Sequence, residues 1–298
     1  MTTSEPETEQ RLVAHADIDL RSTRELVELI NDEDERVAPA VRAAVPELAH
    51  AIDAIVERLR RGGRLVYVGA GSSGRLALVD AAECGPTFGL PPDRVVALVA
   101  GGPTALAVAQ EAAEDDAEGG AADVQAALVG PDDAVVTLSA SGRTPYVLGA
   151  AAFAREQGAR TVGISCTPDS ELARAVEIAI TPLTGPEVIS GSTRLKAGTA
   201  TKLVLNMLST AVMIRLGYVH GNLMVNVRPG SAKLRQRAVE IVARVSGQSA
   251  SRAAELLSAA AGNVRVAILM SRLEIPRPEA EQRLKTAGGR LAEALRNG

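Results

Sequence analysis

The sequence predicts an α/β fold, namely a three-layer doubly wound parallel sheet followed by a small helical domain. Short apolar runs alternate with helical segments through the middle of the chain. Runs that are apolar along their whole length are typical of strands buried on both faces, as in a parallel sheet. After residue 230 no further strand pattern appears, and only helical patterns rich in Ala, Leu and Arg follow.

The elements of the sheet domain follow from these runs. Strands are expected at 64–68, 95–99, 134–138, 161–164 and 176–180. Helices are expected between them at 75–83, 104–110, 121–128 and 145–157. A long apolar helix at 195–216 should pack on the sheet or against a second subunit. Strands that alternate with helices in this way predict a parallel sheet covered on both faces.

The two ends of the chain have a different character. Residues 1–19 form a polar arm that we expect to be ordered only by a partner surface. Ser22 and Glu25 fit a capping box that opens a helix, and a second helix is expected at 41–61. The C-terminal helices are expected at 232–244, 249–261, 264–272 and 279–295. The chain is therefore divided into an N-terminal arm with helices at 1–50, a sheet domain at 51–230 and a helical domain at 231–298.

Composition excludes several classes of function. The 298-residue chain has a net charge of −4 and 2 % aromatic residues, which argues against binding of nucleic acid. No continuous apolar run reaches the roughly 20 residues that span a bilayer, so no membrane partner is expected. The polar N-terminus lacks the apolar core of a secretory signal, and Cys84 and Cys166 alone form no disulfide framework, which fits a reduced cytoplasm. The three histidines lie far apart and show no metal-ligand spacing, so no metal site is predicted.

The turn Gly69-Ala-Gly-Ser-Ser-Gly74 lies between a predicted strand and a predicted helix. It matches the GxGxxG pattern of dinucleotide-binding folds, which also need an acidic residue at the end of the next strand. That strand ends in Val99-Ala-Gly-Gly-Pro103 without a carboxylate, so a nucleotide is not expected. Gly71, Ser72 and Ser73 instead place hydroxyls and backbone N–H groups where an anion can bind.

A second turn has the same chemistry. Ser139, Ser141, Gly142 and Thr144 follow a predicted strand and precede a helix that Pro145 opens. Loops at the carboxyl ends of neighbouring parallel strands share one crevice, so the two turns could hold one phosphate. Ordinary helix N-caps use the same residue types, but two turns with several hydroxyls each favour the phosphate site.

This pair of turns resembles the sugar isomerase domain, which binds sugar phosphates. The resemblance is closer to the N-acetylmuramic acid 6-phosphate etherase family, over residues 69–88, 139–146 and the block GPEVISGSTRLKAGT at 185–199. Thr8-Glu-Gln-Arg11 and Gly221-Asn-Leu-Met-Val225 are similar to the family as well. The glucokinase regulatory protein is a more distant relative of the family.

The chain also departs from the family pattern. Leu12-Val13 replaces an expected Asn-Pro, and His220, Asn226 and residues 228–231 differ from the usual residues. The last two departures concern the hinge to the helical domain, whose role the sequence leaves open.

The resemblance implies a cofactor-free lyase of cell-wall amino sugar recycling in the cytoplasm, acting as a homodimer on a small sugar phosphate. Residues 51–230 would be the sugar isomerase domain. The family reaction removes D-lactate from carbon 3 and leaves N-acetylglucosamine 6-phosphate. A base must take the proton at carbon 2, an acid must protonate the leaving ether oxygen, and water then adds.

Glu83 is the first catalytic candidate, by its match to the family motif. Gly85-Pro86 should end its helix, which would leave Glu83 at the negative helix end. That effect is worth roughly 0.3–1 kcal/mol, whereas one pKa unit is worth about 1.4 kcal/mol. Burial or a second charge must therefore help to keep Glu83 protonated, and a surface glutamate is the alternative.

Glu114 is the second candidate. It lies in an acidic run at 110–118, which is usually a solvated face, and spacing alone cannot choose among its five acids. The resemblance implies Glu114, and we assign Glu83 as the acid and Glu114 as the base, although the two roles could be exchanged. Ser73 and Glu83 lie about 15 Å apart if joined by one helix, so Glu83 could serve a partner subunit's site.

The block at 185–199 adds Ser192, Arg194 and Lys196 as substrate-binding candidates. Arg194 and Lys196 could hold the lactyl carboxylate, secure a loop, or be surface charges at a helix start. The competing function is a non-catalytic sugar-phosphate sensor that resembles the glucokinase regulatory protein. An aldose–ketose isomerase would use the same phosphate turns but has no support from the block at 185–199.

Overall fold

The computed structural model describes residues 6–108, 110–227 and 231–296. Contacts divide the chain into two compact units, residues 1–82 with 93–209 and residues 83–92 with 210–298. The division of function among segments 1–50, 51–230 and 231–298 stays a proposal, because compactness alone does not assign a role.

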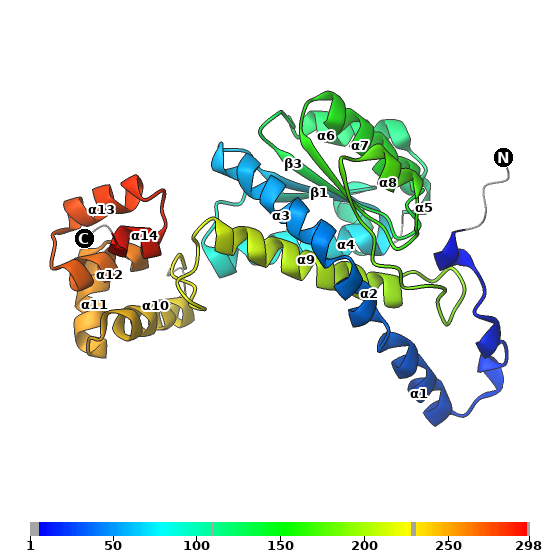
Figure 1. Ribbon diagram of the computed structural model, residues 1–298, viewed down its shortest axis with the longest axis horizontal. Coiled ribbons are helices and arrows are strands. Elements are labelled where there is room, and N and C mark those ends of the chain that lie inside the picture. Colours follow the sequence, from blue (N-terminus) through cyan, green and yellow to red (C-terminus); the bar gives the residue numbers. More distant parts are fainter. Residues whose placement is uncertain (1–5, 109, 228–230, 297–298) are drawn as a thin grey trace. The chain divides into compact units, whose positions relative to one another are not determined.

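Unit 1 is built around a five-stranded parallel sheet of order β2-β1-β3-β4-β5 (Figure 1). The strands are β1 (Leu65–Gly69), β2 (Val95–Val99), β3 (Ala134–Leu138), β4 (Arg160–Ile164) and β5 (Ile178–Ile180). Every residue of β1 and of β3 is buried, as expected for central strands covered on both faces. The predicted α/β fold class is therefore confirmed.

Helices cover both faces of this sheet. They are α3 (Val45–Arg60), α4 (Gly71–Phe88), α5 (Glu111–Glu114), α6 (Ala117–Ala126), α7 (Pro145–Glu156), α8 (Glu171–Ala175) and α9 (Lys196–Arg215). Helix α7 packs on β1, β3 and β4, while α3 packs on β3, β4 and β5 from the opposite side (Figure 1). Apolar side chains of the sheet and of α7, such as Val66, Val135 and Val147, form one buried cluster between them.

The N-terminal helices differ in part from the prediction. Helix α1 (Thr23–Asp34) begins with the expected capping box of Ser22 and Glu25. The single helix expected at 41–61 is wrong, because the chain forms α2 (Val37–Ala43) and then α3. Pro46 lies in the first turn of α3, where its missing N–H is tolerated.

The N-terminal arm folds onto its own chain from residue 6 onward. Short 3₁₀ turns form at η1 (Glu7–Glu9), η2 (Val13–His15) and η3 (Ile18–Leu20). Thr8 is fully buried, and its hydroxyl lies 3.4 Å from that of Thr167. The expectation that a partner surface alone would order the arm is therefore wrong for these residues.

The segment after β2 is less helical than expected. Instead of a helix at 104–110, the chain forms a 3₁₀ helix, η4 (Gly102–Leu106), and then the short α5. Gly101 and Gly102 both have positive φ, which permits a tight reversal before η4.

Helix α9 is long and apolar enough to span a bilayer by length and composition, which corrects the expectation that no such segment exists. In the structure, however, 56 % of its apolar window is buried within the protein. Ala197, Val204 and Leu208 are fully buried. These features are those of a core helix, which satisfies the same test of length and hydropathy.

The described residues of unit 2 form helices joined by loops, with one isolated β-bridge between His220 and Leu223. Its helices are α10 (Ala232–Ser246), α11 (Ala250–Ala259), α12 (Val264–Leu273), α13 (Arg277–Thr286) and α14 (Leu291–Arg296). The single helix expected at 279–295 is divided in two, because Gly288 and Gly289 adopt positive φ. Ile241, Leu257 and Ile268 belong to one buried cluster of this unit.

In this unit, the described residues that depart from the family pattern form hydrogen bonds within the fold. His220 and Leu223 exchange backbone hydrogen bonds of 3.0 Å, and Asn226 donates to the carbonyl of Phe88 at 2.6 Å. Ser231 caps α10 by accepting from the backbone N–H of Leu234. Residues 228–230 lie outside the described part of the chain.

Candidate active site

The two predicted phosphate turns lie side by side at the carboxyl edge of the sheet. Strands β1 and β3 are neighbours, and Gly69 pairs with Leu138 at their last positions. The turns that follow these two residues therefore begin at the same level of the sheet. This adjacency is what the sequence predicted for a shared crevice.

The first turn opens directly into α4. Gly71 has φ of +51°, and Ser72 and Ser73 are half-buried in the first turn of the helix. A β-carbon added at Gly71 would lie 2.7 Å from Oε1 of Glu114. The backbone conformation at this position favours glycine, and the carboxylate of Glu114 lies close to it.

The hydroxyls of the second turn bond to one another rather than to the helix behind them. Oγ of Ser139 lies 2.8 Å from Oγ1 of Thr144 and accepts from the backbone N–H of Gly142 at 3.1 Å. Thr144 precedes α7, yet its side chain makes no capping hydrogen bond. The alternative that these residues are ordinary N-caps therefore loses support at this turn, and half-buried Ser141 and Thr144 can face a ligand.

Glu114 is the acidic residue that the fold brings to the first turn. It ends the short helix α5 and is half-buried, whereas Glu111 at the other end of α5 is exposed. Burial raises the pKa of Glu114, the charges of Asp115 and Glu111 raise it further, and Arg75 opposes them. A raised pKa makes the ionised carboxylate a stronger base.

Glu83 lies on α4 but not in the last turn of the helix, and its side chain is exposed. The expectation that Gly85-Pro86 ends the helix is wrong, since α4 continues to Phe88. Gly89, with φ of +64°, is the residue that ends it.

The block at 185–199 is held by two buried carboxylates that sequence reasoning missed. Glu187 accepts from the backbone N–H groups of Lys196 and Ala197, both at 3.0 Å, and so satisfies the start of α9. Nζ of Lys196 forms an ion pair with Glu33, and both side chains are 3 % exposed. The only sequence feature that could have indicated Glu187 is its position a few residues before a predicted helix start. No local feature of the sequence indicates the role of Glu33.

These contacts separate the three candidates of the block. Lys196 is engaged within the protein, which supports the alternative that it secures a loop. Burial alone would raise the pKa of Glu33, but the hydrogen bond and the charge of Lys196 outweigh it and hold that pKa below its usual range. Arg194 is exposed and Ser192 is half-buried, so both remain accessible.

The N-terminal arm also reaches the carboxyl edge of the sheet. A cavity of ≈ 420 Å³ is lined by Glu7 and Gln10 of the arm and by Ser141 of the second turn. Ser190 donates to the carbonyl of Glu9 at 2.9 Å and so ties the arm to the segment after β5. Sequence reasoning did not place the arm at this edge, because contacts between residues 180 positions apart leave no local signal.

Neither a metal cluster nor a reactive cysteine is found among the described residues. They contain no group of three or more His, Cys, Asp or Glu side chains placed to bind a metal ion. Cys84 and Cys166 are buried, and burial raises the pKa of the Cys166 thiol to about 12.

Comparison with known proteins gives matches over almost the whole chain. Residues 47–155 match the glucokinase regulatory protein N-terminal SIS domain, and residues 107–211 match the SIS domain. A protein of Rubrobacter xylanophilus named N-acetylmuramic acid 6-phosphate etherase is 53 % identical over 98 % of this chain and 96 % of its own length. One of the same name from Caldanaerobacter subterraneus is 47 % identical over 99 % of this chain and 97 % of its own length.

A solved structure supports the fold alone. Phosphoheptose isomerase from Neisseria gonorrhoeae is similar with a TM-score of 0.50 and 19 % identity, over 64 % of this chain and 99 % of that chain.

Proposed function

The chain belongs to the N-acetylmuramic acid 6-phosphate etherase family, and we infer that it catalyses the reaction for which its relatives are named. It is a carbon–oxygen lyase that cleaves the lactyl ether by elimination and addition of water. The products are N-acetylglucosamine 6-phosphate and D-lactate, as in cell-wall amino sugar recycling. The near full-length identity to etherases favours this function over a non-catalytic sensor.

We propose that the two turns at the carboxyl edge bind the phosphate. Gly71, Ser72 and Ser73 would supply backbone N–H groups and hydroxyls from the start of α4. Ser139, Ser141, Gly142 and Thr144 would do the same from the turn before α7. The adjacency of β1 and β3 supports this assignment, because it places both sets of donors at one edge.

Glu114 is proposed as the base that removes the proton from carbon 2 of the open-chain sugar. The electron pair of that C–H bond then forms the C2–C3 double bond as the C3–O bond breaks. The lactyl oxygen takes a proton from the acid. Water then adds across the double bond, with its hydroxyl on carbon 3 and a proton on carbon 2. The observation that carries this proposal is the carboxylate of Glu114 beside Gly71, because it places a half-buried acid at the predicted phosphate turn.

Glu83 is proposed as the acid, acting at the site of a second copy. Along α4, Ser73 and Glu83 are separated by about 15 Å at the rise of an α-helix. A sugar phosphate cannot easily bridge both ends of one helix, so the acid of one chain would complete the partner's site. Ser192 and Arg194 are retained as candidates for the rest of the substrate, whereas Lys196 would act indirectly by holding the start of α9.

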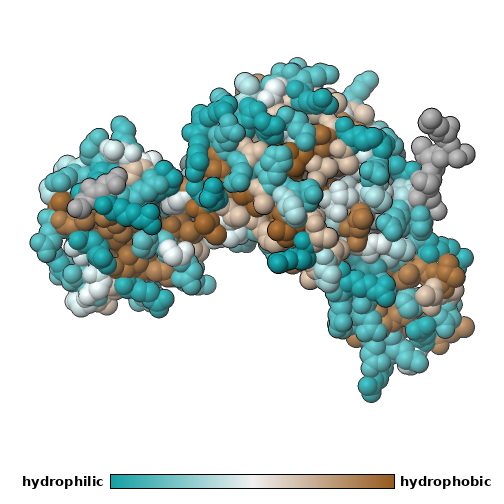
Figure 2. Space-filling view, in the orientation of Figure 1, coloured by the Kyte–Doolittle hydropathy of each residue, from teal (hydrophilic) through white to brown (hydrophobic). Residues whose placement is uncertain are grey.

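We propose that the protein is a cytoplasmic homodimer. Val13, Leu20, Val27 and Ile30 of the N-terminal segment and α1 are between 37 % and 83 % exposed, and Figure 2 shows hydrophobic surface over this region. Apolar surface of this kind is typical of an interaction site. Light scattering should give twice the chain mass of 30.8 kDa, and a monomer at micromolar concentration would contradict the dimer.

The enzyme is tested by mixing purified protein with N-acetylmuramic acid 6-phosphate and following D-lactate. Steady release of lactate is expected. Saturable binding without release would contradict the lyase and favour the sensor. Conversion of an aldose phosphate to a ketose phosphate without lactate would instead favour an isomerase.

A further inference from the structure

Unit 2 contains a cavity that the proposed reaction does not use. It has a volume of ≈ 430 Å³ and is bounded by the segment after α4, the segment after α9 and the start of α12. Its polar side chains include Tyr218, Asn226, Asn263 and Arg265, and none of its lining residues is Asp or Glu. Small-molecule sites commonly occupy about 300–1,000 Å³, so a small metabolite fits the space.

Arg265 is the one cation among the described residues that line this cavity, and in this part of the chain no carboxylate contributes to its electrostatic environment. Its Nη1 donates to the carbonyl of Gly289 at 2.9 Å, while its Nε is buried without a hydrogen-bond partner. Burial lowers the pKa of this guanidinium, and only Tyr218 opposes the shift. A partly buried cation without a counter-ion is costly, so an anion in the cavity would stabilise it.

The start of α12 adds backbone donors to the same cavity. Asn263 caps the ten-residue helix by accepting from the N–H of Val266 at 3.2 Å. The N–H groups of Val264 and Arg265 lie in the first turn, where an α-helix provides no intrahelical acceptor. Ala261 and Gly262 before the cap have φ of +50° and +81°, and the N–H of Gly262 donates to the carbonyl of Leu257 at 2.8 Å, so this left-handed turn ends α11.

We propose that this cavity binds a small phosphate ester, at a site separate from the one where lactate is released. The donor set combines the guanidinium of Arg265 with helix N–H groups, and both kinds of donor match a phosphate oxyanion. The volume beyond the phosphate leaves room for the organic part of the ester. This site would give the helical segment a role as a sensor of phosphorylated metabolites, and it does not depend on the proposed reaction.

Equilibrium dialysis of the full chain with radiolabelled inorganic phosphate tests the site. Wild-type protein should bind two phosphates per chain, one at the serine turns and one in this cavity. Arg265→Met should retain one, with lactate release near that of wild type. Arg272→Met is the matched control, because Arg272 lies on the same helix and likewise donates to a carbonyl, that of Val245 at 3.2 Å; it should retain both.

Competition with N-acetylglucosamine 6-phosphate distinguishes an ester site from one for free phosphate. The ester should displace both labelled phosphates in wild type, and failure to displace the second would overturn the ester. Arg265→Lys keeps the charge without the planar guanidinium and should weaken phosphate binding at the second site at least tenfold. This variant tests the site if Arg265→Met does not fold. Unchanged stoichiometry in a folded Arg265 variant would overturn the site. Loss of lactate release in a folded Arg265→Met would overturn its separation from the site of the reaction.

Discussion

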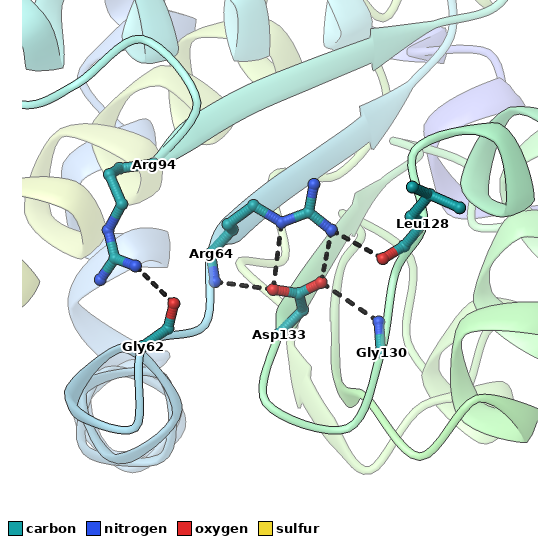
Figure 3. Close-up of polar contacts among 6 residues, drawn as sticks. All are labelled: Gly62, Arg64, Arg94, Leu128, Gly130 and Asp133. Atoms are coloured by element: carbon teal, nitrogen blue, oxygen red, sulfur yellow. Dashed lines mark hydrogen bonds and ion pairs between the residues drawn. The ribbon is translucent and has the colours of Figure 1, made fainter.

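Asp133 at the amino edge of the sheet accepts four hydrogen bonds, whereas Glu114 at the carboxyl edge has no ion-pair partner in the described part of the chain. Figure 3 shows Asp133 held by the guanidinium and backbone N–H of Arg64 and by the N–H of Gly130. Arg64 also donates to the carbonyl of Leu128, and Arg94 nearby donates to that of Gly62 (Figure 3). At the amino edge, therefore, these polar groups form hydrogen bonds with one another.

The carboxyl edge leaves its polar groups less engaged. Ser139 and Thr144 bond to each other, and Ser141 accepts only a long contact of 3.4 Å from the N–H of Arg143. Burial raises the pKa of Glu114, whereas the bonds from Arg64 and Gly130 outweigh burial and lower the pKa of Asp133. One edge thus stabilises the folded chain, and we propose that the other keeps its donors and the Glu114 carboxylate for a ligand.

The largest effect is expected at Glu114. Glu114→Gln removes the proposed base with little change in shape, and kcat should fall about 10²- to 10⁴-fold, the usual contribution of a general base. Lactate release under saturating substrate measures this. Glu111→Gln is the control, because Glu111 lies on the same short helix and is exposed; equal losses in both variants would contradict the assignment.

A mutation at the amino edge should have the opposite pattern. Arg64→Met leaves the buried carboxylate of Asp133 without its main partner and should lower the free energy of unfolding by about 2–3 kcal/mol. Urea denaturation measures this, and kcat/KM of the folded protein should stay near wild type. Arg61→Met is the control, since its pair with Glu57 is exposed and should be worth at most about 1 kcal/mol.

Ser141→Ala removes one hydroxyl from the second turn. A hydrogen bond to a charged group contributes roughly 1.5–3 kcal/mol, so KM should rise at least about tenfold with little change in stability. Ser251→Ala, on the exposed face of α11, should leave KM unchanged. If KM of Ser141→Ala equals that of wild type, the second turn does not hold the phosphate.

The smallest effect concerns the pH dependence of kcat/KM. Asp115 raises the pKa of Glu114 and Arg75 lowers it. The base acts when ionised, so Asp115→Asn should move the acid limb of the profile to lower pH, and Arg75→Met should move it to higher pH. Glu118→Gln, in the same acidic run, should leave the limb in place. Shifts in the reverse directions would show that the acid limb does not report the ionisation of Glu114.

Sequence patterns were sufficient for the sheet, because each buried strand is a continuous apolar run between glycine turns. They were also sufficient to place the two turns together, since parallel strands end at one edge. They failed at Pro86, where α4 continues to Phe88, and near Pro46, which lies in the first turn of α3 just after the helix breaks at Ala44.

Long-range partners were beyond the sequence. Nothing local indicates that Glu33 would pair with Lys196 or that Thr8 would lie against Thr167. The acidic run at 110–118 did not single out Glu114, and only the fold brings one of its carboxylates to Gly71. Which acids meet which turns is a property of packing, which spacing along the chain does not encode.

Exchange of the carbon 2 proton with solvent deuterium is the most direct test of Glu114 as the base. Substrate incubated in deuterium oxide with Glu83→Gln should gain deuterium at carbon 2 while lactate release stays very slow, because the base remains and the acid is lost. Glu114→Gln should neither exchange this proton nor release lactate. Exchange by Glu114→Gln at the rate of Glu83→Gln would contradict the assignment of Glu114 as the base at the carboxyl edge of the sheet.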